Sequence, residues 1–188
     1  MGYSHMFYAV DLPRLRSTFG SQDLGLFEAV VKSSESLTEE ETGALREIIQ
    51  GECRNEPVAE HLYGYALKAI CEHVGELLLV GDVAAVRDHP YRSKLVASGP
   101  PVAIPYTGRD FPEIGHLSRD DLAEEYRLAT ETRPRAKRSL GGFLLRKLTG
   151  GIAGREPDAE DVAEDMEQYA ETLKECINRN ASLVSFRH

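Results

Sequence analysis

Apolar residues recur at helical spacing along residues 57–76, which is the clearest periodic pattern in the chain. A step of about 100° per residue places such positions on one side of an α-helix, where they face a core. Pro57 suits the first turn of this helix. The apolar stripe consists of Val58, Leu62, Tyr65, Ala66, Ala69, Ile70, Val74 and Leu77. Because His73 falls within this stripe, we expect it to be a hydrogen-bonded histidine of the core.

A second helical pattern begins near Pro157 and carries acidic residues in its first turn, as the helix dipole favours. Its apolar positions are Val162, Met166, Tyr169, Leu173 and Ile177. The segment that follows, SLVSFR at 182–187, is rich in β-forming residues. It predicts a final strand that pairs with the first strand of the chain.

The chain begins with a strand and a short helix. Residues 3–10, YSHMFYAV, are aromatic and β-rich and predict the strand. Asp11 is suited to cap a helix, and Pro13 is suited to its first turn. This short helix is expected to end near Gly20.

Two further helices are predicted before residue 57. One starts around Ser21 and has a broad apolar face made by Leu24, Phe27, Ala29, Val30 and Val31. The other starts at Thr38, which forms a capping-box pattern with Glu41, and ends at Gly51. Its inward face consists of Leu45, Ile48 and Ile49.

The segment from residue 77 to residue 106 has a weaker pattern. LLLV at 77–80 and VAIPY at 102–106 are both candidates for short strands. Pro100 and Pro101 break the path between them.

Ser118, with Asp121 three residues later, predicts the start of a helix that runs to about Thr132. Together these elements predict an α+β fold with six or seven helices. The helices pack against a small sheet formed by N-terminal, middle and C-terminal strands. We expect one domain over residues 1–188.

Composition restricts the class of protein without changing this fold. The chain has 188 residues, of which 41% are hydrophobic and 28% are charged, as in an ordinary soluble globular domain with one core. The longest aliphatic run, Leu77–Val80, is far shorter than the roughly 20 residues of a membrane helix. The N-terminus has no basic region typical of a signal peptide. We therefore expect a cytoplasmic protein that does not bind membranes.

The cysteines and histidines do not predict a metal site. Cys53, Cys71 and Cys176 are widely spaced and odd in number, so we expect free thiols. Cys71 and Cys176 fall in helical patterns, where cysteine acts as a small apolar residue. The six histidines lack the spacing of metal ligands. No cofactor signature is present either.

Residues 133–155 are unusual because they carry seven basic side chains and no acidic ones. Subtracting these seven positive charges from the net charge of −9 leaves −16 on the other residues. Residues 156–167 alone contribute seven carboxylates. We expect a basic, glycine-rich connector that lies near these acids and partly neutralises them, at about 0–1 kcal/mol for each exposed pair.

The same segment has a second interpretation, as a lid or docking peptide. Glycines suited to act as hinges flank its apolar block FLLRKL; they are Gly141, Gly142, Gly150, Gly151 and Gly154. Its candidate binding residues are Arg138, Phe143, Arg146 and Lys147. Nucleic-acid binding is disfavoured because the chain is acidic and Phe143 is the segment's one aromatic residue. The glycines also lack the following Lys-Ser/Thr pair of a phosphate-binding loop.

The segment YTGRDFPEIGHLSRDD, residues 106–121, is the most polar candidate for a catalytic or binding site. It reads as a loop held by prolines and glycines, and polar loops often carry function. His116 is a candidate general base, which Asp110 or Glu113 would orient. Arg109 would hold an anionic substrate. No nucleophile accompanies these residues, so the alternative is that their charges decorate a structural connection.

Three phrases resemble a known group of sequences. They are FYAVDLPRLRSTFGSQD, LYGYALKAICEHVGE and DFPEIGHLSRDDL. In these phrases the chain resembles a group of uncharacterised bacterial proteins of similar length, classed as a domain of unknown function. The resemblance covers most of residues 3–130. It implies a bacterial origin and no particular activity.

Two hypotheses of function follow from the sequence. The leading hypothesis is a non-catalytic domain that binds a protein partner, in a regulatory or toxin-neutralising role. It rests on the absence of a catalytic constellation and on the acidic charge, which steers basic partners. The alternative is a small-molecule-binding protein or hydrolase-like enzyme with a pocket around Arg109, Asp110 and His116.

Overall fold

The computed structural model describes residues 4–34, 37–54, 59–81, 93–109, 111–131 and 159–188. Four strands form one antiparallel sheet in the order β2-β1-β4-β3. The strands are β1 His5–Val10, β2 Glu76–Gly81, β3 Glu113–Leu117 and β4 Ser182–Arg187. The terminal strands β1 and β4 are paired neighbours at the centre of the sheet, which confirms the predicted pairing.

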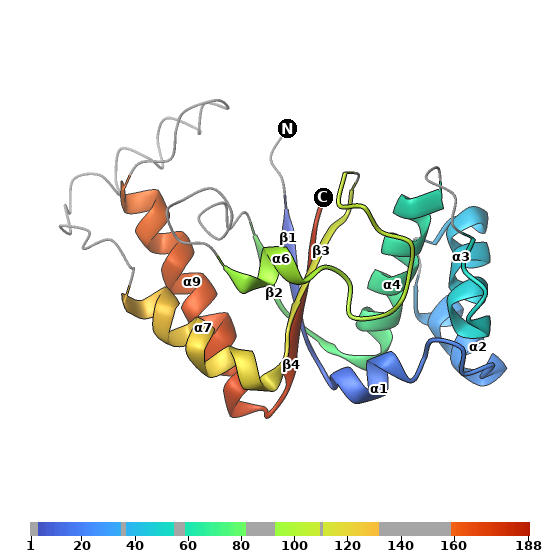
Figure 1. Ribbon diagram of the computed structural model, residues 1–188, viewed down its shortest axis with the longest axis horizontal. Helices are drawn as coiled ribbons and strands as arrows, with labels where there is room; N and C mark the ends of the chain where they lie inside the picture. Colours follow the sequence, from blue (N-terminus) through green and yellow to red (C-terminus); the bar gives the residue numbers. More distant parts are fainter. Residues whose placement is uncertain (1–3, 35–36, 55–58, 82–92, 110, 132–158) are drawn as a thin grey trace.

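Helices cover both faces of this sheet (Figure 1). One face carries α1 Leu12–Arg16, α2 Leu24–Ser33, α3 Glu39–Gln50 and α4 Glu60–Val74. The other carries α7 Arg119–Glu131 and α9 Ala159–Asn178, with the short α6 Lys94–Ser98 beside β3. The predicted α+β fold with N-terminal, middle and C-terminal strands is confirmed.

Alternating side chains of the strands build a separate apolar core on each face. In β1, Tyr8 and Val10 belong to the core shared with α1, α2, α3 and α4. Phe7 and Ala9 belong to the core shared with α7 and α9. The central strands are buried on both sides, which explains why most of their residues are apolar.

Three caps at the ends of two helices, α1 and α3, follow from local sequence. Asp11 accepts a hydrogen bond from the amide of Arg14 at 3.4 Å at the start of α1. The capping box between Thr38 and Glu41 is complete at the start of α3. Gly51 ends α3 with a φ of 75°, a left-handed conformation that glycine adopts readily. These three predicted caps are confirmed, but α1 ends at Arg16 and not near Gly20.

The boundary predicted for α2 was three residues too early. α2 begins at Leu24 because Asp23, and not Ser21, accepts a hydrogen bond from the amide of Leu26, at 3.0 Å. Val30 is fully buried, whereas Leu24 is exposed. A capping side chain has to lie within reach of the first helical amides, and Asp23 satisfies this condition.

In α4 the helix is confirmed but its buried face is only partly as predicted. Tyr63, Leu67 and Cys71 are buried together with the predicted Ala66, Ala69 and Ile70. Leu77 lies in β2, and Val58 lies outside the described residues. His73 is exposed, with its Nδ1 3.3 Å from the hydroxyl of Ser33, so its assignment to the core was wrong. The helix is rotated relative to the predicted stripe because it packs against both α3 and the sheet.

In α9 the predicted stripe is confirmed at Val162, Met166, Tyr169 and Leu173, all of which are buried. Ile177 is exposed, and the buried position in the last turn is Cys176. The buried positions therefore continue the three- and four-residue spacing of the helix. Neither α9 nor any other helix within the described ranges is long and apolar enough to cross a membrane.

The middle of the chain departs most from the prediction. LLLV does form most of β2, but VAIPY at 102–106 is not a strand. Instead, the amide of Ile104 donates to the Val102 carbonyl oxygen, which closes a tight turn. The third strand is EIGHL at 113–117, inside the segment that reads as a polar loop. The helix α6 was not predicted, because five residues give too little periodicity.

Candidate functional site

Three polar side chains from three adjacent strands lie in one row across the sheet. His5 of β1 is paired with Arg187 of β4, which in turn is paired with Glu113 of β3. Nη1 of Arg187 lies 3.1 Å from Oε2 of Glu113. His5 and Arg187 are each only 6% exposed, and the imidazole of His5 stacks on the ring of Phe7. Glu113 is half-buried, and a row that combines this anion with a buried cation and a buried titratable ring is unusual in a sheet.

The helix α6 lies directly on the next row of the sheet. A Cβ atom at Gly115 would lie 2.1 Å from the carbonyl oxygen of Leu95, so only glycine permits this close approach. Gly115 is paired with Ser185, whose hydroxyl donates to the Gly115 carbonyl oxygen at 3.5 Å. The position of α6 over β3 therefore depends on the missing side chain at Gly115.

The N-terminus of α6 is fixed by a buried carboxylate of α7. Glu125 is almost fully buried and accepts hydrogen bonds from the hydroxyls of Ser93 and, at 2.8 Å, Tyr169. The Ser93 hydroxyl also accepts from the amide of Leu95 at 3.0 Å and so caps the helix. A buried carboxylate needs such partners to offset its lost hydration. This network ties α6 to α7 and α9.

The loop between α6 and β3 forms the opposite wall. The amide of Ile114 donates to the hydroxyl of Tyr106 at 2.8 Å, which holds the aromatic ring against the edge of β3. The buried carboxylate of Glu60 accepts hydrogen bonds from the amide and hydroxyl of Thr107, the latter at 2.7 Å, and from the amide of Gly108 at 3.0 Å. The first turn of α4 thus positions the loop.

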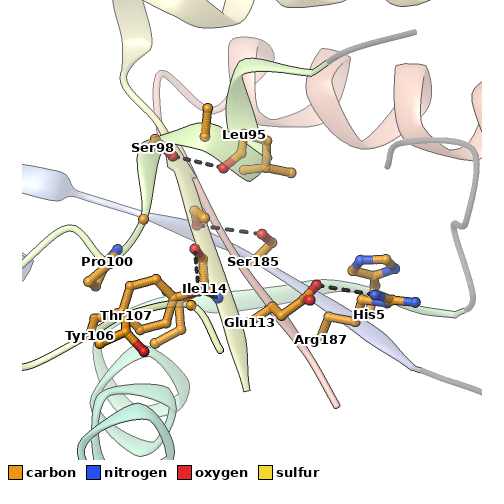
Figure 2. Close-up of a pocket in the computed structure, with 14 residues that line it drawn as sticks. His5, Leu95, Ser98, Pro100, Tyr106, Thr107, Glu113, Ile114, Ser185 and Arg187 are labelled. Carbon is orange, nitrogen blue, oxygen red and sulfur yellow. Dashed lines mark hydrogen bonds and ion pairs between the residues drawn. The ribbon is translucent and has the colours of Figure 1, made fainter. Parts of the chain in front are cut away.

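These walls enclose a cleft of about 510 Å³ (Figure 2). Its volume is in the range of small-molecule binding sites. The polar side chains that line it are His5, Ser98, Thr107, Glu113, Ser185 and Arg187. Leu95, Tyr106 and Ile114 contribute apolar surface. The lining is therefore mixed, with polar groups that converge beside apolar surface, as in many ligand sites.

The structure brings together only some of the residues expected to form a site. Glu113 lines the cleft, but His116 does not. Alternation along β3 places His116 on the other face of the sheet, with its Nδ1 2.8 Å from the carbonyl oxygen of Gly99. Arg109 is exposed and does not line the cleft. Asp110 lies outside the described residues, as do the predicted connector and its candidate binding residues Arg138, Phe143, Arg146 and Lys147.

Sequence reasoning missed the other two members of the row, His5 and Arg187. Each lies inside a segment that was correctly predicted as a strand. A charged or titratable residue within an otherwise apolar central strand was the available signal, because such positions are expected to be buried.

Among the described residues, the thiols and the acidic side chains form no second candidate site. All three cysteines are free. Burial raises the pKa of Cys53 to about 11 and that of Cys176 to about 12, and it also raises the pKa of Cys71. Little thiolate is therefore present at neutral pH. Within the part of the chain that the structure describes, no group of three or more His, Cys, Asp or Glu side chains is arranged to hold a metal ion.

Comparison with known families matches residues 1–188 to a family described as "Domain of unknown function (DUF7691)". The chain belongs to this family. The expected class, a domain of unknown function, is thereby confirmed over residues 1–188. A bacterial origin stays a prediction. No curated protein and no solved structure matches the chain.

Proposed function

We propose that this protein binds a small organic anion in the cleft between α6, the Tyr106 loop and the sheet. The observation that carries the proposal is the ion pair between the buried Arg187 and the half-buried Glu113, which lines the cleft. The proposal retains the small-molecule hypothesis from the sequence. It moves the pocket from Arg109, Asp110 and His116 to a neighbouring row of strand residues.

The energetics of the buried guanidinium group support a binding role. Removing the charge of Arg187 from water costs several kcal/mol, and its attraction to Glu113 offsets this cost only when the geometry is good. An apolar pair of similar volume is often as stable. Arg187 and Glu113 are therefore poorly explained by stability alone. Polar groups at the wall of a cavity are explained if they contact a ligand.

The chemistry of the row indicates the class of ligand. A guanidinium group binds carboxylate and phosphate oxygens in a planar, two-pronged geometry. His5, in the same row as Arg187, would add a second hydrogen bond or positive charge to the anion. Glu113 would accept a hydrogen bond from a hydroxyl or ammonium group of the same molecule. The rings and aliphatic chains of Tyr106 and Leu95 would contact its carbon skeleton.

Calorimetric titration with inorganic phosphate, succinate and glutamate tests this proposal. We expect saturable binding of at least one of these anions, and weaker binding to Arg187→Lys because an ammonium group lacks the planar fork. Arg109→Ala is the matched control, since this exposed arginine does not line the cleft. Circular dichroism would establish that both variants are folded.

Two results would contradict the proposal. One is the absence of saturable binding for all three anions. The other is a larger loss of affinity in Arg109→Ala than in Arg187→Lys, which would return the site to the pocket expected around Arg109, Asp110 and His116.

A second candidate function is non-catalytic binding of a protein partner, with a regulatory or toxin-neutralising role. It is supported by Leu77 and Val80, which are 48% and 51% exposed on the edge strand β2. Large apolar side chains at a sheet edge favour association with another chain. The net charge of −9 favours a basic partner. Recovery of a stoichiometric partner on an affinity column carrying the folded protein would test this function.

A further inference from the structure

The two edges of the sheet differ in how their outward backbone groups are satisfied. At β3, the amide of Ile114 donates to the Tyr106 hydroxyl at 2.8 Å, and the amide of His116 donates to the Ser98 hydroxyl at 2.7 Å. These two side chains occupy the positions that an added strand would need. The β3 edge is therefore closed to another chain.

The β2 edge has an outward amide and carbonyl group at Val80. Ser4, just before β1, exchanges backbone hydrogen bonds with His188, just after β4. Because the backbone groups of successive residues in a strand point in opposite directions, the amide of Phe7 points away from β4 and toward Leu79 of β2. The next residue, Val80, consequently points its backbone groups away from the sheet. Among the described residues, no hydrogen bond is formed to these groups.

The two sides of the β2 edge have different chemistry. On the side of α4, Leu77 and Val80 are exposed. On the side of α9, a groove of about 330 Å³ is lined by β2 and by polar residues of the last helix. Its charged side chains are Glu171, Glu175 and Arg179.

The groove side carries excess negative charge. Arg179 binds two carboxylates, with its Nε 2.7 Å from Oε1 of Glu175 and its Nη1 on Glu76. Glu171 is exposed and adds a third carboxylate. These four side chains have a net charge of −2.

We infer that the β2 edge binds an extended segment of a partner protein in which apolar and basic side chains alternate. An added strand would form backbone hydrogen bonds with Val80, and its alternate side chains would point to opposite faces. Those on one face would contact Leu77 and Val80, and those on the other would contact Glu171 and Glu175. This inference rests on the partner-binding function proposed above and is independent of the cleft.

Charge favours a basic partner over a second copy of the chain. Antiparallel pairing of two β2 strands would place the negatively charged groove of one copy beside that of the other. Like charges on the two grooves would repel one another and disfavour the pairing. A basic strand replaces this repulsion with attraction.

Fluorescence anisotropy with a short labelled peptide of alternating lysine and valine tests the inference. The comparison peptide has the same composition, with all lysines followed by all valines. We expect the alternating peptide to bind about ten-fold or more tightly than the comparison peptide, since only its side chains match both faces of the edge. Its affinity is expected to fall as salt is added.

Two variants locate the peptide. Val80→Pro removes the outward amide, a change that an edge strand tolerates, and should abolish the preference for the alternating peptide. Glu171→Lys should weaken binding through charge reversal. Glu28→Lys on α2 is the matched control, since Glu28 is an exposed glutamate on the other face of the sheet. Circular dichroism would verify the fold of each variant.

The opposite outcomes overturn the inference in distinguishable ways. Equal binding of both peptides, or equal effects of Glu171→Lys and Glu28→Lys, would indicate nonspecific attraction. Self-association of the full chain that Val80→Pro removes would identify a second copy as the occupant. Tighter peptide binding after alanine replacement of Arg138, Arg146 and Lys147 would identify the chain's own basic segment.

A further control separates this inference from the partner-binding function itself. A stoichiometric partner recovered equally by wild type and Val80→Pro would leave that function standing and refute the β2 edge as its site. Failure to recover any partner would refute both.

Discussion

The two edges of the sheet differ in their outward backbone amides. At the β3 edge, hydroxyl groups of α6 and of the loop after it accept hydrogen bonds from these amides. At the β2 edge, the outward amide of Val80 has no such acceptor among the described residues, and the side chains of Leu77 and Val80 are exposed beside it. The closed edge adjoins the cleft, and the open edge adjoins an acidic groove. The same elements therefore close this edge and form the cleft. Tyr106 and α6 do both, so changes to them should affect stability far more than changes at β2.

The largest difference in stability is expected between glycine-to-alanine variants of the two edge strands. Gly115→Ala should destabilise the protein by about 3 kcal/mol, because the new Cβ would overlap the backbone of α6. Gly81→Ala should change stability by less than about 0.5 kcal/mol, since the nearest atom to its Cβ is Oε1 of Gln168 at 3.8 Å. Urea denaturation measures both. Similar midpoints for the two variants would show that α6 does not constrain β3.

Removing one hydroxyl should open the closed edge. Tyr106→Phe leaves the amide of Ile114 without its acceptor, at a cost of about 1–2 kcal/mol. The Ile114 amide should then exchange with solvent faster, which hydrogen-exchange NMR detects. Tyr126→Phe is the control, because within the described part of the chain the Tyr126 hydroxyl has no hydrogen bond to lose. Unchanged exchange at Ile114 would show that the edge is closed by other contacts.

Truncating an exposed side chain of the open edge should have a smaller effect. Leu77→Ala is expected to cost less than about 1 kcal/mol, because nearly half of the side chain is already in contact with water. Leu117→Ala in β3 is the comparison, where the fully buried side chain predicts a loss of about 2–5 kcal/mol. Thermal unfolding of both variants checks this. Equal losses would mean that Leu77 is covered in solution.

The smallest predicted effect concerns Asp121, at the junction of β3 and α7. A hydrogen bond from the Ser118 hydroxyl, with the ion pair to Lys94, holds the pKa of Asp121 below its usual range. Its contribution to stability is present above the unfolded pKa of about 3.9 and is lost as pH falls through the lower folded pKa. Ser118→Ala should raise this pKa toward the unfolded value.

NMR titration of the Asp121 carboxyl group in wild type and Ser118→Ala measures the shift. Asp120 in the same helix serves as the internal reference, since Ser118 does not donate to it. An unchanged Asp121 pKa in Ser118→Ala would show that the Lys94 pair alone is responsible.

The elements that sequence reasoning located well are those determined by neighbours along the chain. The capping box of Thr38 and Glu41 and the left-handed Gly51 both arise within a few residues. The long helices α4 and α9 each bury enough residues to show a clear period. Their ends, and the orientation of His73 or Ile177, depend on what packs beside them.

The candidate site shows the limit of the same reasoning. Glu113 was recognised as a candidate because it lies in a polar segment, but its partners Arg187 and His5 are 74 and 108 residues away in sequence. Only the register of β1, β4 and β3 places the three side chains in one row. No local pattern specifies that register.

The amino-acid sequence already specifies the α+β class, the main helices, the terminal strands and the acidic charge. These follow from periodicity, caps and composition, which are local properties. Tertiary packing selects which short segment becomes the third strand. EIGHL forms β3 because Gly115 lets α6 approach and Tyr106 and Ser98 satisfy its outer edge, whereas VAIPY has a proline and turns back on itself. It also decided the cleft and the open β2 edge, because both depend on pairing between strands that are distant along the chain.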